Sequence, residues 1–130
     1  MIETQGIVHF TIAVSDIEVS ERFYRELLGL TVVQRIPSEA MVFMRCGEDY
    51  LILAKSNKAI DPNPENEVLI HHAFRVSLDH YEASISFLKS KGIEILHEEN
   101  RRQGVFVGRQ AYFHDPDRNV IEIIALEQAA

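Results

Sequence analysis

The feature of this sequence that most constrains its fold is an internal repeat. Residues 8–15 (VHFTIAVS) align with residues 70–77 (IHHAFRVS) when the chain is shifted by 62 residues, which places His9 over His71. One inserted residue then makes the shift 63, and Gly29 falls on Gly92. Because similar segments recur in the same order, we expect two copies of one structural module.

Each copy has the pattern of a strand, a helix and three further strands. Residues 7–14 are rich in Val, Ile, Phe and Thr, which favour strands. Ser15 and Asp16 can cap the start of a helix, and Gly29 is a typical residue just after a helix end. The expected later strands are residues 30–36, 40–45 and 50–54 in the first copy and 93–97, 109–114 and 119–126 in the second, after a strand near 70–77 and a helix near 79–91. The prediction is an α+β fold with the order βαβββ twice.

Length and turn residues indicate one domain. The chain has 130 residues, 46% of them apolar and 25% charged, which suits one globular domain. Residues 55–69 contain Ser56-Asn57 and Pro62-Asn63-Pro64 and have no periodicity. We therefore expect a single domain over residues 1–130, with one module at about 6–54, a linker at about 55–69 and a second module at about 70–126.

Charge and cysteine content argue against several classes of partner. Thirteen basic and twenty acidic residues leave a net charge of −7, which repels nucleic acid and anionic membranes. No apolar run approaches the ~20 residues needed to cross a bilayer. Cys46 is the only cysteine, and the first residues lack the basic and apolar regions of a signal peptide. A cytoplasmic protein with a small-molecule substrate is expected.

Two histidines and one glutamate are candidate metal ligands. His9 and His71 occupy the same position in the two copies, and Glu122 interrupts the apolar run VIEII. A glutamate in such a strand is rarely buried unless it is paired or binds a metal. Two imidazoles and a carboxylate suit Fe(II), Mn(II) or Zn(II). Each residue also has a plain structural interpretation: the histidines can be ordinary strand residues, and Glu122 can be exposed or paired with Arg75.

The motifs resemble those of the vicinal oxygen chelate superfamily, which includes glyoxalase I, fosfomycin-resistance enzymes, extradiol dioxygenases and bleomycin-resistance proteins. The resemblance extends from Gly6 to Leu126 and is carried by the motifs HFTIAV at 9–14, LGL at 28–30, HHAF at 71–74 and YFHDPDRNVIE at 112–122. It implies curled antiparallel sheets that form a metal-binding cleft, and a divalent ion (Mn, Zn, Ni or Fe) bound by His9, His71 and Glu122. His72 is the competing second ligand, but it should face the other side of its strand.

A fourth position separates the enzymes of this family. Four-ligand glyoxalase I enzymes carry an acid in the first copy at the place of Glu122, whereas here that place holds Leu53 or, with one gap, Ile52. A register error would instead bring in Glu48 or Asp49. The apolar residue counts against a glyoxalase I reaction and favours comparison with fosfomycin-resistance enzymes and extradiol dioxygenases.

The resemblance also assigns roles around the metal. Tyr112 is expected either to donate a hydrogen bond to a bound oxyanion or to be an ordinary aromatic residue of a half-buried strand, and Thr11 is expected to orient the substrate. Glu39 matches the base of epoxide-hydrating relatives, through an alignment with a gap. The charged segment 97–108 is expected to be a loop whose Arg101 or Arg102 binds an anionic end of the substrate, although solvated arginines are the plainer interpretation.

The leading functional hypothesis is a metal-dependent enzyme of the lyase, transferase or hydrolase kind. Its divalent ion would act as a Lewis acid on a small oxygenated substrate. A Fe(II) extradiol-type dioxygenase is the second hypothesis, weakened because Ala111 and Arg118 depart from that pattern. A non-catalytic, bleomycin-resistance-like binding protein is the third. The resemblance further implies a homodimer in which each site takes its first ligand from one chain and the other two from its partner.

Overall fold

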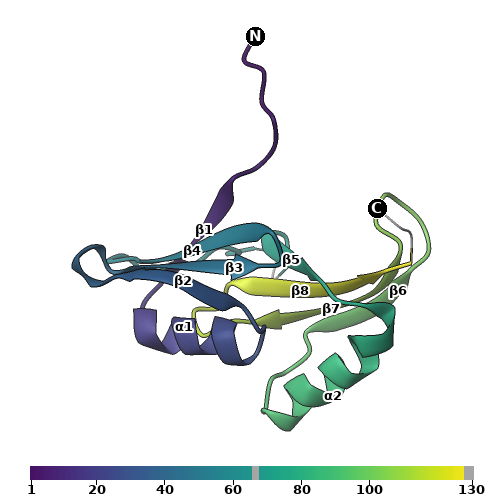
Figure 1. Cartoon of the computed structure of the whole chain (residues 1–130). Coiled ribbons are helices and arrows are strands. Elements are labelled where there is room, and N and C mark those ends of the chain that lie inside the picture. Colours follow the sequence, from purple (N-terminus) through teal and green to yellow (C-terminus); the bar gives the residue numbers. More distant parts are fainter. Residues whose placement is uncertain (66–67, 128–130) are drawn as a thin grey trace. The chain divides into compact units, whose positions relative to one another are not determined.

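Each copy of the repeat folds as a four-stranded sheet with one α-helix. The computed structural model describes residues 1–65 and 68–127 (Figure 1). The chain divides into two compact units, Met1–Ile60 and Asp61–Ala130, which are called here the first and the second unit. The boundary falls inside the segment expected to be the linker.

The first unit contains four strands, one α-helix and one short 3-10 helix. In chain order these are β1 (His9–Val14), α1 (Ile17–Glu26), β2 (Thr31–Ile36), the 3-10 helix Pro37–Glu39, β3 (Met41–Cys46) and β4 (Asp49–Lys55). The strands are ordered β1-β4-β3-β2 across the sheet. The last strand therefore lies between the first strand and the β2–β3 hairpin.

The second unit repeats this arrangement. Its elements are β5 (His71–Arg75), the 3-10 helix Leu78–His80, α2 (Tyr81–Ser90), β6 (His97–Arg101), β7 (Gly108–His114) and β8 (Val120–Leu126). The strands are ordered β5-β8-β7-β6. The expected βαβββ order is thus confirmed in both units.

The sheets are mixed, whereas the resemblance implied antiparallel ones. In the first unit β1 runs parallel to β4, and in the second β5 runs parallel to β8; the other pairs are antiparallel. Parallel neighbours need a long crossover, and the helix with the following hairpin provides it. Sequence patterns locate strands but do not say which strands pair, so this feature was not predicted.

The second strand of the second unit, β6, begins later than expected. Residues 93–96 are outside any strand, and β6 occupies His97–Arg101, within the segment expected to be a loop. Its sequence HEENR is poor in strand-forming residues. Pairing with β7 overrides this weak preference, and charged residues suit a strand at the sheet edge.

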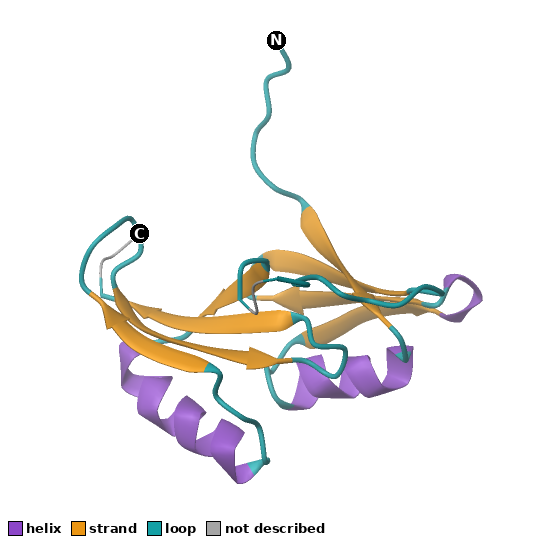
Figure 2. Cartoon of the chain, turned by 180° about the vertical axis from the view of Figure 1, so that it is seen from behind, coloured by secondary structure: helices purple, strands orange, loops and turns teal. Residues whose placement is uncertain are grey.

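The helix in each unit lies along one face of its own sheet (Figure 2). Asp16 caps α1 as expected, because its carboxylate accepts hydrogen bonds from the backbone N–H groups of Glu18 and Val19, both at 3.1 Å. The helix-facing sides of the strands supply the core, including Val14, Leu53, Phe113 and Ile121, which are fully buried. Within the part of the chain that the structure describes, neither α-helix is long and apolar enough to span a membrane.

The opposite face of each sheet carries the residues of functional interest. Side chains alternate along a strand, so His9 and Thr11 share one face of β1, and His71 shares a face of β5 with Ala73. In both units this is the face away from the helix-facing core residues.

Candidate metal centre

His71 and Glu122 meet on neighbouring strands of the second unit. Parallel pairing of β5 with β8 sets Ala73 beside Glu122, so His71 lies diagonally across from it. The Nε2 atom of His71 is 3.1 Å from Oε1 of Glu122. Arg75, the other partner considered for Glu122, lies beside Ile124. The structure thus brings together two of the three residues predicted to bind a metal.

A backbone carbonyl orients the His71 ring. Nδ1 of His71 is 2.8 Å from the carbonyl oxygen of Val68. A carbonyl oxygen only accepts hydrogen bonds, so Nδ1 donates the proton and the lone pair of neutral His71 lies on Nε2, towards Glu122. Metal-binding histidines are commonly held in this way by a carbonyl or carboxylate behind the ring.

Glu122 is a buried acid in an apolar strand. It is 5% exposed, and its strand neighbours Ile121 and Ile123 are also buried. Burial raises the pKa of Glu122, and the adjacent His71 and Tyr112 oppose that rise. A buried carboxylate with an imidazole nitrogen beside it is a donor set that suits a divalent cation.

Tyr112 lies over both of these residues. It sits opposite Glu122 in the antiparallel β7–β8 pair, and its ring packs edge-to-face against His71 with centroids 5.3 Å apart. Burial, followed by the nearby Glu122 carboxylate, raises the pKa of Tyr112 to about 12. The phenol therefore keeps its proton at neutral pH and can donate a hydrogen bond, as its assigned role requires.

Three further residues of this face were not singled out by sequence reasoning. Tyr112 donates a hydrogen bond of 3.4 Å to Gln110, whose amide donates one to Glu99. The His97 ring packs against the other side of Tyr112, with centroids 5.9 Å apart. Because side chains alternate along a strand, Gln110 could have been found from its position two residues before Tyr112. Glu99 and His97 could not, because the sequence did not predict where β6 lies.

The two candidate arginines have different surroundings. Arg101 ends β6 and forms an ion pair with Glu99 at 3.5 Å, and its positive charge partly opposes the rise in the pKa values of Glu122 and Tyr112. Arg102 instead forms a two-pronged ion pair with Glu127, at 2.8 and 2.5 Å. Of the pair, Arg101 is the one whose charge acts on the candidate centre.

His72 faces the other side of β5, as the alternation along a strand predicts. It is half-buried, and burial lowers its pKa while the charge of Asp115 opposes this. Phe74 shares its side, whereas His71 shares the side of Ala73 and Arg75. The register therefore separates His72 from the His71–Glu122 pair.

In the first unit, His9 and Thr11 lie exposed on one face of β1. Thr11 Oγ1 is 3.4 Å from Nδ1 of His9. Beside His9 the register places Tyr50 on β4 and, one strand further, Arg45 on β3. Neither residue was selected from the sequence, and their shared face with His9 emerges only from the strand pairing.

Ile52 is the residue of the first unit at the position of Glu122. Thr11 pairs with Ile52 in the first unit, just as Ala73 pairs with Glu122 in the second. Of the two residues considered, Ile52 and not Leu53 is therefore the equivalent of Glu122. Glu48 lies in the turn between β3 and β4. Asp49 pairs with Cys46 and comes one residue before Tyr50, the neighbour of His9. Neither acid replaces Glu122 on this face.

Glu39 lies at the far end of the first sheet from His9. It belongs to the exposed 3-10 helix Pro37–Glu39, just before Met41, which pairs with Ala54 beside Ala13. Four residues separate Ala13 from His9, which is about 13 Å along a strand. The first unit therefore does not bring Glu39 beside His9.

Each unit alone holds an incomplete ligand set. Within the described part of the second unit, no third His, Cys, Asp or Glu side chain joins His71 and Glu122 in a group able to bind a metal. In the first unit, the carboxylate position is occupied by Ile52. The donors present in the second unit are of the kind that fit a divalent metal.

Comparisons with known proteins agree with this fold. The family model of the Glyoxalase/Bleomycin resistance protein/Dioxygenase superfamily matches residues 6–123. The glutathione transferase FosA of Serratia marcescens is 31% identical over 119 residues, which cover 92% of this chain and 79% of that protein. The metallothiol transferase FosB of Staphylococcus haemolyticus is 30% identical over 122 residues, covering 92% and 82%.

A solved structure has the same fold. The fosfomycin resistance protein FosX from Listeria monocytogenes, in complex with Mn(II) and a sulfate ion, superimposes with a TM-score of 0.76 at 20% identity and covers 95% of this chain and 91% of its own. The family match spans nearly the whole chain, and the matched relatives are enzymes. The chain therefore belongs to the glyoxalase/bleomycin resistance protein/dioxygenase superfamily and is an enzyme of that superfamily.

Proposed function

We propose that the chain is a divalent-metal-dependent enzyme acting on a small oxygenated substrate, with His9, His71 and Glu122 as the metal ligands. The observation that carries this proposal is the His71–Glu122 pair. Two ligand atoms at bonds of about 2.1 Å and a right angle are about 3.0 Å apart, and Nε2 of His71 is 3.1 Å from Oε1 of Glu122. The names and complexes of the relatives, FosB as a metallothiol transferase and FosX with Mn(II), support a divalent metal.

His9 is the proposed third ligand. It is the repeat equivalent of His71, it is exposed, and no acid accompanies it on its own sheet face. We further propose that both units belong to one domain and that two chains form a homodimer, in which His9 of one chain completes the centre formed by His71 and Glu122 of its partner. The incomplete ligand set of the second unit supports a shared centre.

When bound, the metal would supply Lewis-acid chemistry to oxygen atoms of the substrate. Residues of the chain would bind and orient the substrate. The protonated Tyr112 donates a hydrogen bond to negative charge developing on a substrate oxygen. In this structure the hydroxyl donates its one proton to Gln110. On substrate binding it would turn that hydrogen bond to the substrate oxygen, and Arg101 would attract an anionic substrate group. Thr11, next to His9, is the proposed contact from the first unit.

The relatives indicate which reaction to test first. FosA is named as a glutathione transferase, FosB as a metallothiol transferase and FosX as a fosfomycin resistance protein. We propose a fosfomycin-resistance-like reaction on an anionic epoxide or a similar substrate. Glu39, the base suggested for water addition, has the weaker support because it lies at the far end of the sheet from His9.

Elemental analysis of anaerobically purified protein is the deciding experiment. Wild type should contain close to one first-row metal per chain, and His9→Ala, His71→Ala and Glu122→Ala should lose it, while His72→Ala keeps it. The metal-loaded enzyme is then incubated with fosfomycin, with and without glutathione, and with a catechol under an oxygen electrode. Oxygen uptake with the catechol would establish a dioxygenase instead. A wild type that binds no metal even after reconstitution would refute the enzyme mechanism and leave a binding protein.

A further inference from the structure

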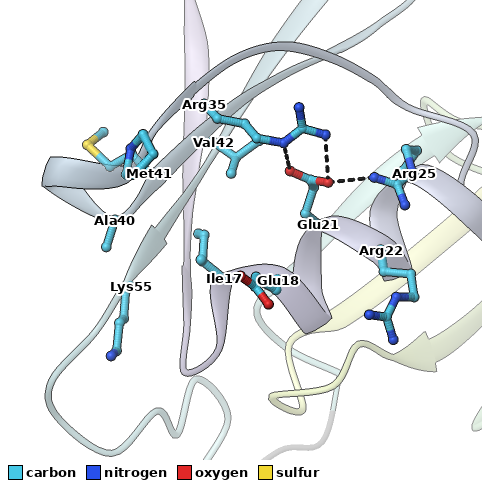
Figure 3. A pocket seen from close by; sticks show the side chains of 11 residues that line it. Ile17, Glu18, Glu21, Arg22, Arg25, Arg35, Ala40, Met41, Val42 and Lys55 are labelled. Atoms are coloured by element: carbon cyan, nitrogen blue, oxygen red, sulfur yellow. Dashed lines mark hydrogen bonds and ion pairs between the residues drawn. The ribbon is translucent and has the colours of Figure 1, made fainter.

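A hollow on the first unit lies on the helix side of its sheet, away from His9. It has a volume of about 520 Å³ and is lined by α1, the end of β2, the 3-10 helix and the start of β3 (Figure 3). Sites for small molecules commonly have volumes of about 300–1,000 Å³. Ile17 and Val42 supply part of an apolar wall. This hollow is separate from the face that carries the candidate metal ligands.

Positive charge is concentrated around this hollow. Four of its lining residues are cations: Arg22, Arg25, Arg35 and Lys55. The whole chain has only 13 Lys and Arg residues against 20 acids, yet only two acids, Glu18 and Glu21, line the hollow. A cavity lined by an excess of one charge raises the local concentration of ligands of the opposite charge. In an acidic protein, this is the part of the first unit that suits an anion.

An ion-pair network fixes part of the lining. Glu21 accepts hydrogen bonds from Nε and Nη2 of Arg35 at 2.6 and 3.0 Å, and from Nη1 of Arg25 at 2.5 Å (Figure 3). Its side chain is only 12% exposed. A guanidinium has five N–H donors, so Arg35 still has the two on Nη1 for a ligand. The network orders the guanidinium before any ligand arrives, which lowers the entropy cost of binding.

Two other cations of the lining are unpaired. Within residues 1–65 and 68–127, the side chains of Arg22 and Lys55 form no ion pair or hydrogen bond. Both residues are exposed, and neither is needed to hold α1 to the sheet. Charged donors next to an apolar wall suit a ligand that is itself divided into an anionic and an apolar part.

We propose that this hollow binds a small organic anion, a phosphate monoester or carboxylate with an apolar body. The anionic group would contact the free edge of Arg35, Arg22 and Lys55 would add positive charge at the rim of the hollow, and the apolar body would lie against Ile17 and Val42. The site does not depend on the proposed metal centre, which lies on other sheet faces.

The test is a titration of the full-length ¹⁵N-labelled chain, with and without Zn(II), followed by NMR. Phenyl phosphate, inorganic phosphate and phenol serve as probes. Phenyl phosphate should shift the Arg35 Nε–H signal and the Met41 and Val42 amide signals with a Kd below about 1 mM. It should bind more tightly than inorganic phosphate, which lacks the apolar body, and than phenol, which lacks the charge. The result should be the same with and without Zn(II).

The double variant Arg22→Gln/Lys55→Gln should weaken phenyl phosphate binding about tenfold or more, because the anionic probe loses the attraction of two nearby positive charges. Lys89→Gln, which changes the charge of the exposed surface of α2, is the matched control and should leave the Kd unchanged. Equal weakening in the control would mean that net charge alone attracts the probe. That result, an absence of saturable shifts at these three residues, or equal affinity for phosphate and phenyl phosphate would overturn the proposal.

Discussion

The two units share one backbone plan but differ on the sheet face that carries the histidine. Glu122 of the second unit corresponds to Ile52 of the first, and Tyr112, opposite Glu122, corresponds to Phe43, opposite Ile52. One row further, Gln110 corresponds to Met41. A polar, hydrogen-bonded group in one unit is therefore replaced by apolar side chains in the other.

Of the candidate metal ligands on these two sheet faces, only the histidine is present in both units. A shared metal centre needs one face with most of the ligands and a second face that adds one. An apolar partner face then leaves coordination positions open for substrate, as three-ligand catalytic sites do. Under the proposed shared centre, His9 would be a ligand even though its own sheet face lacks a carboxylate.

The largest effect should come from removing the carboxylate that distinguishes the second unit. Glu122→Gln is expected to lower metal affinity by more than about 100-fold, because even changes to groups behind the ligands cost 10–100-fold. Calorimetric titration with Mn(II) measures this. Ile52→Gln, at the corresponding position of the first unit, should leave the stoichiometry unchanged. A similar loss in both variants would contradict the proposed ligand set.

The second comparison exchanges the corresponding aromatic residues of the two units, Tyr112 and Phe43. Tyr112→Phe removes only the hydroxyl, so metal content should be retained while kcat falls about 100-fold, the usual cost of losing one donor to a developing oxyanion. Because the pKa of Tyr112 is raised to about 12, the wild-type rate should show no loss from its ionisation up to about pH 10. The reverse change, Phe43→Tyr, should not alter kcat. Unchanged kcat in Tyr112→Phe would remove this residue from the mechanism.

A third variant tests whether the first unit tolerates a carboxylate. Ile52 is 5% exposed, so Ile52→Glu should lower the free energy of unfolding by about 2–4 kcal/mol in metal-free protein. Burial would raise the folded-state pKa of the introduced acid, so this destabilisation should grow as the pH rises above its unfolded value of about 4.3. Urea unfolding at pH 4 and pH 7 measures both. Stabilisation of the variant by added Mn(II) would show that the first unit can form a centre of its own with His9.

A smaller effect is expected at matching turns. Arg118 has φ = 64° in the turn between β7 and β8, where the β3–β4 turn has Gly47 at φ = 59°. Left-handed conformations cost L-residues about 1–2 kcal/mol. Arg118→Gly should therefore raise the free energy of unfolding by about 1 kcal/mol, and Gly47→Ala should lower it. Thermal and urea unfolding can detect these changes. A loss of stability in Arg118→Gly, or a gain in Gly47→Ala, would contradict the turn comparison.

The smallest effect concerns the ion pairs that join helix to sheet. In the first unit Arg35 and Arg25 lower the pKa of Glu21, whereas in the second unit Arg109 pairs with Glu82. Because the pKa of Glu21 is lower in the folded state, its ion pairs stabilise the fold above about pH 4.5. This stabilisation is lost as the pH falls through the folded-state pKa. Glu21→Gln should cost less than about 1 kcal/mol at pH 7 and nothing at strongly acidic pH. Glu94→Gln, exposed in the second unit, is the control for the loss of one surface carboxylate.

Much of the fold was predictable because it depends on local patterns and on the repeat. Asp16 was expected to cap α1 and does so, since capping involves only neighbouring residues. His71 was preferred over His72 from the repeat register, and the structure places His71, not His72, against Glu122. His9, His71 and Glu122 as ligands remain a prediction until metal is measured.

Other features depended on contacts between distant segments. The parallel pairing of β5 with β8 determines that His71 lies across from Glu122, and no periodicity encodes which strands pair. The strand β6 formed in a charged segment expected to be a loop, because pairing with β7 outweighed its composition. Gln110, Glu99 and His97 joined Tyr112 only through that pairing.

By itself, then, the sequence determined the duplicated βαβββ plan and the candidate residues, since alternating apolar patterns, capping residues and a repeat are local properties of the chain. Only the tertiary structure decided which residue of the first unit corresponds to Glu122, which arginine acts on Tyr112, and that a cationic hollow lies beside α1. These depend on strand register and on side chains brought together from separate segments, and hydrogen bonds between strands, unlike local propensities, are set by the fold as a whole.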